Sequence, residues 1–198
     1  MISTNSILWK YIDFDHPVTF TTNVFLELLK HSRQFHIFCL PPGSVYNSSI
    51  PDIDYIFTTT FQCSHSLKWV SIVDSPLSTL TFLRFAPNLE LLDVSGCRNL
   101  VDDDFTVVKD LSSLCQLYVS FTAVKPHTLA DIVQHKSITV LDACGVKFGV
   151  TSCKSVLEHV KDSIVSLSIS LDIEVSEQAF KHELRHHLKN CKINIHRQ

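Results

Sequence analysis

A recurring pattern of apolar residues limits what this 198-residue chain can fold into more than any other feature. In the clearest copy, Leu89, Leu92 and Val94 precede Cys97 and Leu100 in the form L-x-x-L-x-L-x-x-C. Four further clear copies begin at Leu67, Leu114, Ile138 and Ile164. Three weaker copies begin at Trp9, Phe35 and Leu188. A pattern that recurs every 20 to 50 residues indicates structural units stacked on one another.

The spacing of the copies predicts the cross-section of each unit. Their first residues are separated by 26, 32, 22, 25, 24, 26 and 24 residues. A step of this size leaves roughly 15 residues after each short strand, enough for a helix of about two to three turns. We therefore expect an α/β fold, a right-handed leucine-rich-repeat solenoid with parallel strands on the concave face and helices on the convex face.

The segments between the copies carry signals of helix starts and of turns. Residues typical of helix N-termini precede apolar residues at helical spacing at Thr22, Asp102, Pro126, Ser152 and Ser176. The longest step contains two prolines, a glycine and an Asn-Ser-Ser run, so we expect a turn-rich insertion near 41–51. Residues 1–198 are expected to form a single domain of about seven to eight repeats of roughly 25 residues.

Two stretches of the chain resemble a known family. Residues 88–105, NLELLDVSGCRNLVDDDF, are close to the N-L-x-x-L-D-L-S-G-C-x-x-(I/L)-T-D pattern of the cysteine-containing repeats of F-box/leucine-rich-repeat proteins. Residues 8–14, LWKYIDF, are similar to the L-W-x-x-(I/V)-D-(F/L) strand that commonly follows an F-box. With the weaker copies, the resemblance covers nearly the whole chain. It implies a substrate receptor of a cullin ubiquitin ligase, which binds a protein and delivers it for ubiquitination.

The chain departs from this family in one respect. Only eight residues precede Trp9, whereas an F-box is a helical module of several tens of residues. A Skp-type adaptor and a cullin are therefore expected as partners only through additional upstream sequence. The alternative is a leucine-rich-repeat scaffold in a complex unrelated to ubiquitination.

The residues between the consensus positions of each strand are expected to alternate onto the concave face. Aromatic side chains there would anchor a protein ligand, and carboxylates would favour a basic or hydroxyl-bearing segment. The predicted protein-binding residues are Tyr11, Asp13, Trp69, Ser71, Leu91, Asp93, Gln116, Tyr118 and Asp142. Ser166, Ser168 and Ser170 form a flat strip where binding is weaker or another segment packs closely. The alternative is an ordinary solvated face.

One motif suggests metal chemistry. The stretch from His182 to His186 reads H-E-x-x-H, the spacing by which two helical histidines bind zinc in metalloproteases. The apolar residues of this helix place both histidines on its outer face, and no acidic residue follows Glu183 to complete a site. We therefore expect a solvated histidine-rich helix.

Other catalytic and cofactor motifs are missing from the sequence. Its four glycines form neither a phosphate-binding loop nor a dinucleotide fingerprint, and there is no G-x-S-x-G elbow, so we expect no enzyme activity and no cofactor. The Asp102 to Asp104 run is expected to stabilise a helix start. Seven cysteines without a C-x-x-C pair indicate reduced thiols, with Cys97 buried and Cys144 the more exposed.

Charge and hydropathy exclude two classes of partner. Seventeen basic and twenty acidic residues give a formal charge of −3 and no basic stripe, so nucleic acid is not an expected partner. No uncharged apolar run reaches the roughly 18 to 20 residues of a membrane span, and the first residues lack the features of a secretory signal. We expect no membrane contact and a cytoplasmic location, with the nucleus as the alternative.

Overall fold

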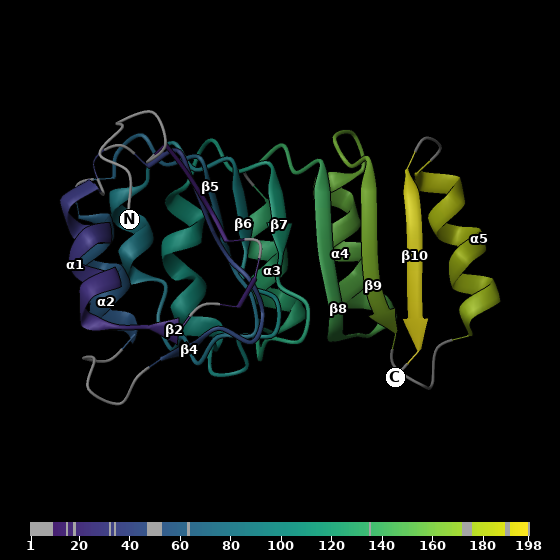
Figure 1. Cartoon of the computed structure of the whole chain (residues 1–198). Coiled ribbons are helices and arrows are strands. Elements are labelled where there is room, and N and C mark those ends of the chain that lie inside the picture. The colour runs from purple at the N-terminus through teal and green to yellow at the C-terminus, as the bar shows by residue number, and fades with distance from the viewer. Residues whose placement is uncertain are drawn as a thin grey trace.

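The computed structural model describes residues 10–14, 16–17, 19–31, 33, 35–46, 53–62, 64–134, 136–171, 176–188 and 191–197. Within them, eight strands form one sheet in the order β1-β3-β5-β6-β7-β8-β9-β10, and every neighbouring pair is parallel. The bounds are β1 Tyr11–Asp13, β3 Ile37–Leu40, β5 Trp69–Ile72, β6 Leu91–Asp93, β7 Gln116–Tyr118, β8 Val140–Phe148, β9 Ser166–Leu171 and β10 Lys192–Arg197. Each of the eight predicted repeats therefore supplies one strand, and the strands follow chain order; β5 to β10 run from left to right in Figure 1.

Helices connect successive strands, as parallel pairing requires. They are α1 (Thr22–His31), α2 (Ile53–Phe61), the 3-10 helices η3 (Thr81–Phe85) and η4 (Asp102–Asp110), α3 (Pro126–Val133), α4 (Val150–Val160) and α5 (Glu177–His187). From α1 to α4, each helix packs against the next. The chain is therefore an α/β protein in which a parallel sheet in chain order lies against a layer of helices, and this part of the fold prediction is confirmed.

The helix-start signals were accurate at three of five places. α1 begins at Thr22, α3 at Pro126, and α5 directly after Ser176. The segment after Asp102 is a 3-10 helix, and α4 begins at Val150, two residues before the expected Ser152. The sequence prediction missed α2 and η3.

The expected insertion near 41–51 is not simply a loop. Gly43 lies in a turn with φ of +78°, but β4 (Val45–Tyr46) pairs in parallel with β2 (Thr19–Phe20) to form a separate two-stranded sheet. Residues 47–51 of the predicted insertion lie outside the described residues. The described part of this segment is thus a turn followed by a short strand.

The core lies between the sheet and the helices. The apolar consensus residues of the five clear copies are buried, among them Leu67, Leu92, Leu117, Leu141 and Leu167. Near α2 the core contains five phenylalanines whose neighbouring ring centroids lie 5.2 to 6.0 Å apart, namely Phe35, Phe38, Phe57, Phe61 and Phe82. The apolar pattern therefore specifies which side of each strand faces the helices.

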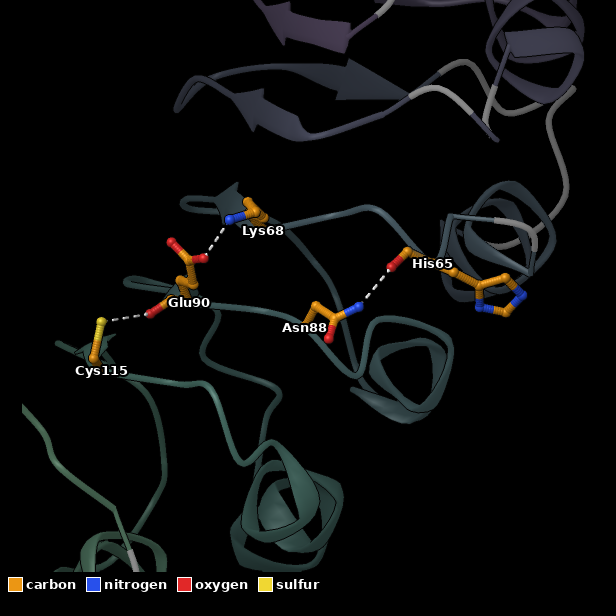
Figure 2. Close-up of polar contacts among 5 residues, drawn as sticks. All are labelled: His65, Lys68, Asn88, Glu90 and Cys115. Carbon is orange, nitrogen blue, oxygen red and sulfur yellow. Dashed lines mark hydrogen bonds and ion pairs between the residues drawn. The ribbon is translucent and has the colours of Figure 1, made fainter.

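Polar contacts connect neighbouring repeats at the amino-terminal ends of the strands, just before β5, β6 and β7 begin. Lys68 Nζ lies 2.6 Å from Glu90 Oε1, and the Cys115 thiol donates to the Glu90 carbonyl oxygen at 3.5 Å (Figure 2). Asn88 Nδ2 donates to the His65 carbonyl oxygen at 3.1 Å. These partners are 22 to 25 residues apart in sequence, which matches the repeat spacing.

None of the described helices has both the length and the apolar character that a membrane span requires.

Candidate protein-binding face

One face of the sheet is turned away from the helices, and the predicted binding residues lie on it. In β6, Leu91 and Asp93 are half-buried on either side of the fully buried Leu92, and β7 repeats this alternation. Trp69 keeps 41% and Tyr11 keeps 59% of its surface exposed. We call this surface the open face.

The strand register assembles the predicted residues into two straight rows. The first row contains Tyr11, Ile37, Trp69, Leu91, Gln116, Val140, Ser166 and Lys192. The second row contains Asp13, Cys39, Ser71, Asp93, Tyr118, Asp142, Ser168 and Asn194. All nine predicted binding residues belong to these rows, four to the first and five to the second.

The two rows differ in chemistry. From β1 to β8 the first row is apolar except at Gln116, and its aromatic members are the exposed Tyr11 and Trp69. The second row holds three carboxylates, Asp13, Asp93 and Asp142. Because successive outward residues of a strand are two positions apart, the rows lie about 6.6 Å from each other.

Asp93 is held in an unfavourable electrostatic position. Its Oδ1 accepts the Ser95 N–H at 3.0 Å, and Ser71 Oγ lies 3.5 Å from its Oδ2. Burial raises the pKa of this carboxyl above its ordinary value, and the charge of Asp142 adds to the rise, while the hydrogen bonds from Ser95 and Ser71 oppose it. The carboxylate would therefore be stabilised by an added positive charge.

Tyr118 lies between these two carboxylates in the second row. Burial, then the charges of Asp93 and Asp142, raise the pKa of its phenol. Its hydroxyl lies 3.4 Å from Gln116 Oε1, toward which it donates. Tyr118 therefore stays neutral on this face and acts as an aromatic surface with one polar group.

Two thiols on the open face are poor nucleophiles. Burial, with the charges of Asp13 and Asp93, raises the pKa of Cys39 to about 11. Burial and the neighbouring Asp142 raise the pKa of Cys144 to about 12. Since the thiolate is the reactive form, the partly exposed Cys144 has little reactivity at neutral pH.

Two sequence motifs have the structural roles that were predicted for them. His182 and His186 are exposed on α5, while Leu184 between them is buried, which confirms their outer-face position. Asp104 Oδ2 accepts the Val101 N–H at 2.8 Å, which is the predicted contact at the start of its own helix. Asp102 Oδ1 instead accepts the Lys125 N–H at 2.8 Å, at the start of α3 in the next repeat, a contact that was not predicted.

No group of three or more His, Cys, Asp or Glu side chains in the described residues is arranged to hold a metal ion. Cys97 is fully buried, and its thiol donates to the Ile72 carbonyl oxygen at 3.1 Å, as expected for a residue that packs between repeats.

The sequence prediction missed a hollow of about 550 Å³ beside the second row. It lies at the carboxyl-terminal ends of the strands, where Ser95, Ser120 and Cys144 contribute small side chains. Asp142 connects the hollow to the second row, and Phe121 lies at its lining with 59% of its surface exposed. The sequence signal that could have located it is the eighth residue of each repeat, which is Phe121 in the repeat that begins at Leu114. The apolar repeat pattern does not specify the residue type at that position.

Compared with models of known protein families, the sequence matches none, and no curated protein matches it significantly.

Proposed function

We propose that this chain is a leucine-rich-repeat protein-recognition module that binds a segment of a protein partner across the open face. The solenoid architecture is supported by eight parallel strands in chain order, each followed by a helical connection or the chain end, at sequence steps of 22 to 32 residues. The observation that carries the functional proposal is the apolar first row next to the acidic second row.

The spacing between the carboxylates of the second row suggests how basic residues are spaced on the partner. Asp93 and Asp142 lie two strands apart, hence about 9.6 Å from backbone to backbone. Seven residues of an α-helix span about 10.5 Å. A helix laid across the strands would therefore place basic residues seven positions apart near these carboxylates, with its apolar stripe on the first row.

Aromatic residues supply most of the expected binding energy. Trp69 is a large, partly exposed anchor in the first row, and Tyr118 offers its ring between two carboxylates in the second. Side chains of this kind dominate the energetics of protein interfaces, whereas exposed charges mainly contribute selectivity. The strands from β5 to β8 thus form the centre of the proposed interface.

The resemblance of residues 88–105 and 8–14 to F-box/leucine-rich-repeat proteins supports a more specific role. In this proposal the chain is a substrate-receptor-like component of a cullin ubiquitin ligase, and a Skp-type adaptor joins it through upstream sequence. A scaffold unrelated to ubiquitination would use the same face without these two partners.

Site-specific photo-crosslinking tests the proposal. A photoreactive amino acid at position 69 should capture a protein that one at position 55 does not, because Tyr55 lies on α2 and is 55% exposed. Capture by a second probe at position 116 should be lost in Trp69→Ala and retained in Tyr55→Ala. Capture that is indifferent to both substitutions contradicts recognition by the open face.

The composition of the captured complex distinguishes the ligase role from the scaffold role. The captured complex is purified from cells that express the chain with its native upstream sequence. A Skp-type adaptor and a cullin in stoichiometric amounts support the ligase role. Their absence from a complex that still depends on Trp69 removes that role and leaves the scaffold.

A further inference from the structure

Four repeats share a positive φ at the same position, three of them in the loop after the strand and the fourth at the irregularity within β8. Asp74, Gly96, Phe121 and Gly145 each occupy the eighth position of their repeat, and their φ angles are +49°, +76°, +57° and +86°. Glycine adopts such angles without steric cost and aspartate tolerates them, but a bulky residue is strained there. Of the four residues, Phe121 is thus the one for which a positive φ has the highest steric cost.

Phe121 does not compensate for this strain by burial. Its side chain is 59% exposed, although it packs against Gly145, where an added Cβ would lie 2.7 Å from Phe121 Cδ1. The ring lines the hollow of about 550 Å³ beside the second row. A strained backbone that presents an exposed aromatic ring to a hollow suggests that the ring contacts a ligand.

The residues that line the hollow also include two carboxylates, Asp142 and Asp74. Asp142 Oδ1 accepts hydrogen bonds from Ser120 Oγ and from the Cys144 N–H, which fix the orientation of the carboxylate. Within the described part of the chain, neither Asp142 nor Asp74 forms an ion pair with a basic side chain. The one titratable base among the lining residues is His196 on β10.

Small neutral side chains separate the carboxylates from one another. Ser95 and Ser120, which follow β6 and β7, lie between Asp74 and Asp142, and Ser170 lies beyond Asp142 on β9. The missing side chain of Gly96 leaves room for the Asp74 carboxylate. A cation entering the hollow beside Phe121 would therefore meet an aromatic ring and the Asp142 carboxylate. The described residues contain no group of three or more His, Cys, Asp or Glu side chains arranged to hold a metal ion, whereas an aromatic ring favours an organic cation.

We propose that this hollow receives an arginine side chain of the bound protein segment. The planar guanidinium stacks on the Phe121 ring and donates to the Asp142 carboxylate. Lysine offers no such plane and binds more weakly. This inference rests on the proposed function, because the hollow adjoins the second row through Asp142 and extends the same interface.

Short capped peptides test the hollow without knowledge of the partner. The probes are acetyl-Gly-Arg-Gly-amide and its citrulline analogue, which has nearly the same shape and no charge. Both are titrated into the ¹⁵N-labelled full chain and followed by amide chemical shifts. The arginine peptide should shift the amides of Gly96, Phe121 and Gly145 saturably, with a dissociation constant of about 1 mM, and the citrulline peptide should not.

Three variants assign the shifts to the proposed contacts. Phe121→Gly and Phe121→Leu should weaken arginine binding by about two- to fivefold, the range expected for a solvent-exposed cation–π contact. Asp142→Asn, which keeps the oxygen that accepts from Ser120, should weaken it about tenfold or more. Tyr55→Ala removes an exposed aromatic side chain of α2 and should leave binding unchanged.

The melting temperature of Phe121→Gly distinguishes a ligand-binding role of Phe121 from a purely structural one. If Phe121 mainly stabilised the fold, its loss would lower the melting temperature. Phe121→Gly should melt at the same temperature as the unsubstituted chain or higher, because glycine relieves the left-handed backbone. A clear fall in melting temperature, or equal shifts with both peptides, overturns the proposal.

The two proposals fail independently. If crosslinking depends on Trp69 but the peptides are not distinguished, the open face stands and the hollow does not bind arginine. If the arginine peptide binds the hollow while crosslinking ignores Trp69, the open-face proposal is wrong.

Discussion

Ser120 donates a hydrogen bond of 2.5 Å from its Oγ to Asp142 Oδ1, on the neighbouring repeat 22 residues away. The same Ser120 oxygen accepts the Cys144 N–H at 2.9 Å. One hydroxyl therefore orients a carboxylate of the second row and fixes the backbone at the hollow. Because Ser120 is itself buried, water cannot easily replace these bonds.

Ser120→Ala should lower the free energy of unfolding by about 1.5 to 3 kcal/mol, the usual range for a hydrogen bond to a charged group. Urea denaturation followed by circular dichroism measures the change. Ser113→Ala, at an exposed turn position, is the control and should lie within about 0.5 kcal/mol of the unsubstituted chain. Equal effects of the two substitutions would show that the Ser120 bonds contribute nothing.

Cys144 should react slowly with iodoacetamide at pH 8. With a pKa of about 12, only roughly one thiol in 10⁴ is ionised at that pH. Asp142→Asn removes the neighbouring negative charge and should accelerate the reaction at Cys144. Peptide mapping by mass spectrometry measures the rate. Asp110→Asn, at the end of η4, should leave the rate unchanged, and a rate that Asp142→Asn does not alter contradicts the assigned cause.

Asp93→Asn should stabilise the fold at neutral pH. The folded-state pKa of Asp93 is raised above 3.8, so the folded chain holds this proton more tightly than the unfolded chain. The stabilising contribution of the proton is present below pH 3.8 and is lost as the pH rises through the folded pKa. Asparagine keeps an oxygen for the Ser95 N–H and carries no charge.

The pH dependence distinguishes this cause from a general packing effect. Urea denaturation at pH 7 and at pH 4 should show a larger stabilisation by Asp93→Asn at pH 7. Asp103→Asn, in the exposed start of η4, is the matched control. A variant that is destabilised equally at both pH values refutes the electrostatic explanation.

Lys136→Met should destabilise the fold by about 1 to 3 kcal/mol. Lys136 is buried, and its Nζ donates to the carbonyl oxygens of Lys109 and Leu111 at the end of η4, at 3.1 and 2.5 Å. Burial lowers the pKa of this ammonium group, yet methionine would leave the two carbonyls without their donor. Thermal unfolding measures the loss, with the exposed Lys161→Met as control; an equal melting temperature for both variants contradicts the role.

The sequence predicted the strands well because each must bury one side. Leu92, Leu117 and Leu141 are fully buried against the helices, and a shift by one residue would expose all of them. That requirement also placed Trp69 and Asp93 correctly on the other side. The two rows follow directly once the strands pair in register.

The helices were less predictable from the sequence. Ile53, Ile56, Phe57 and Phe61 of α2 have helical spacing, but the prolines and serines before them favoured a loop. The segment from Asp102 has the residues of a helix start, but it forms a 3-10 helix, although its repeat is no shorter than the one that contains α3.

The hollow could not be predicted because it depends on backbone angles. Nothing in the sequence indicates that Phe121 has a positive φ, since glycine or asparagine is the usual residue at such a position. The apolar pattern fixes the buried positions and leaves the eighth position of each repeat open. The positions of Phe121 and Asp74 in the lining of one hollow therefore depend on loop conformations that the apolar pattern does not specify.

The shared left-handed turn at Asp74, Gly96, Phe121 and Gly145 has an evolutionary consequence. Since the backbone is left-handed at this position whether the residue is aspartate, glycine or phenylalanine, the position accepts different side chains. Selection could retarget such a protein to a new ligand by point substitutions along this rim, while the sheet beneath keeps its shape.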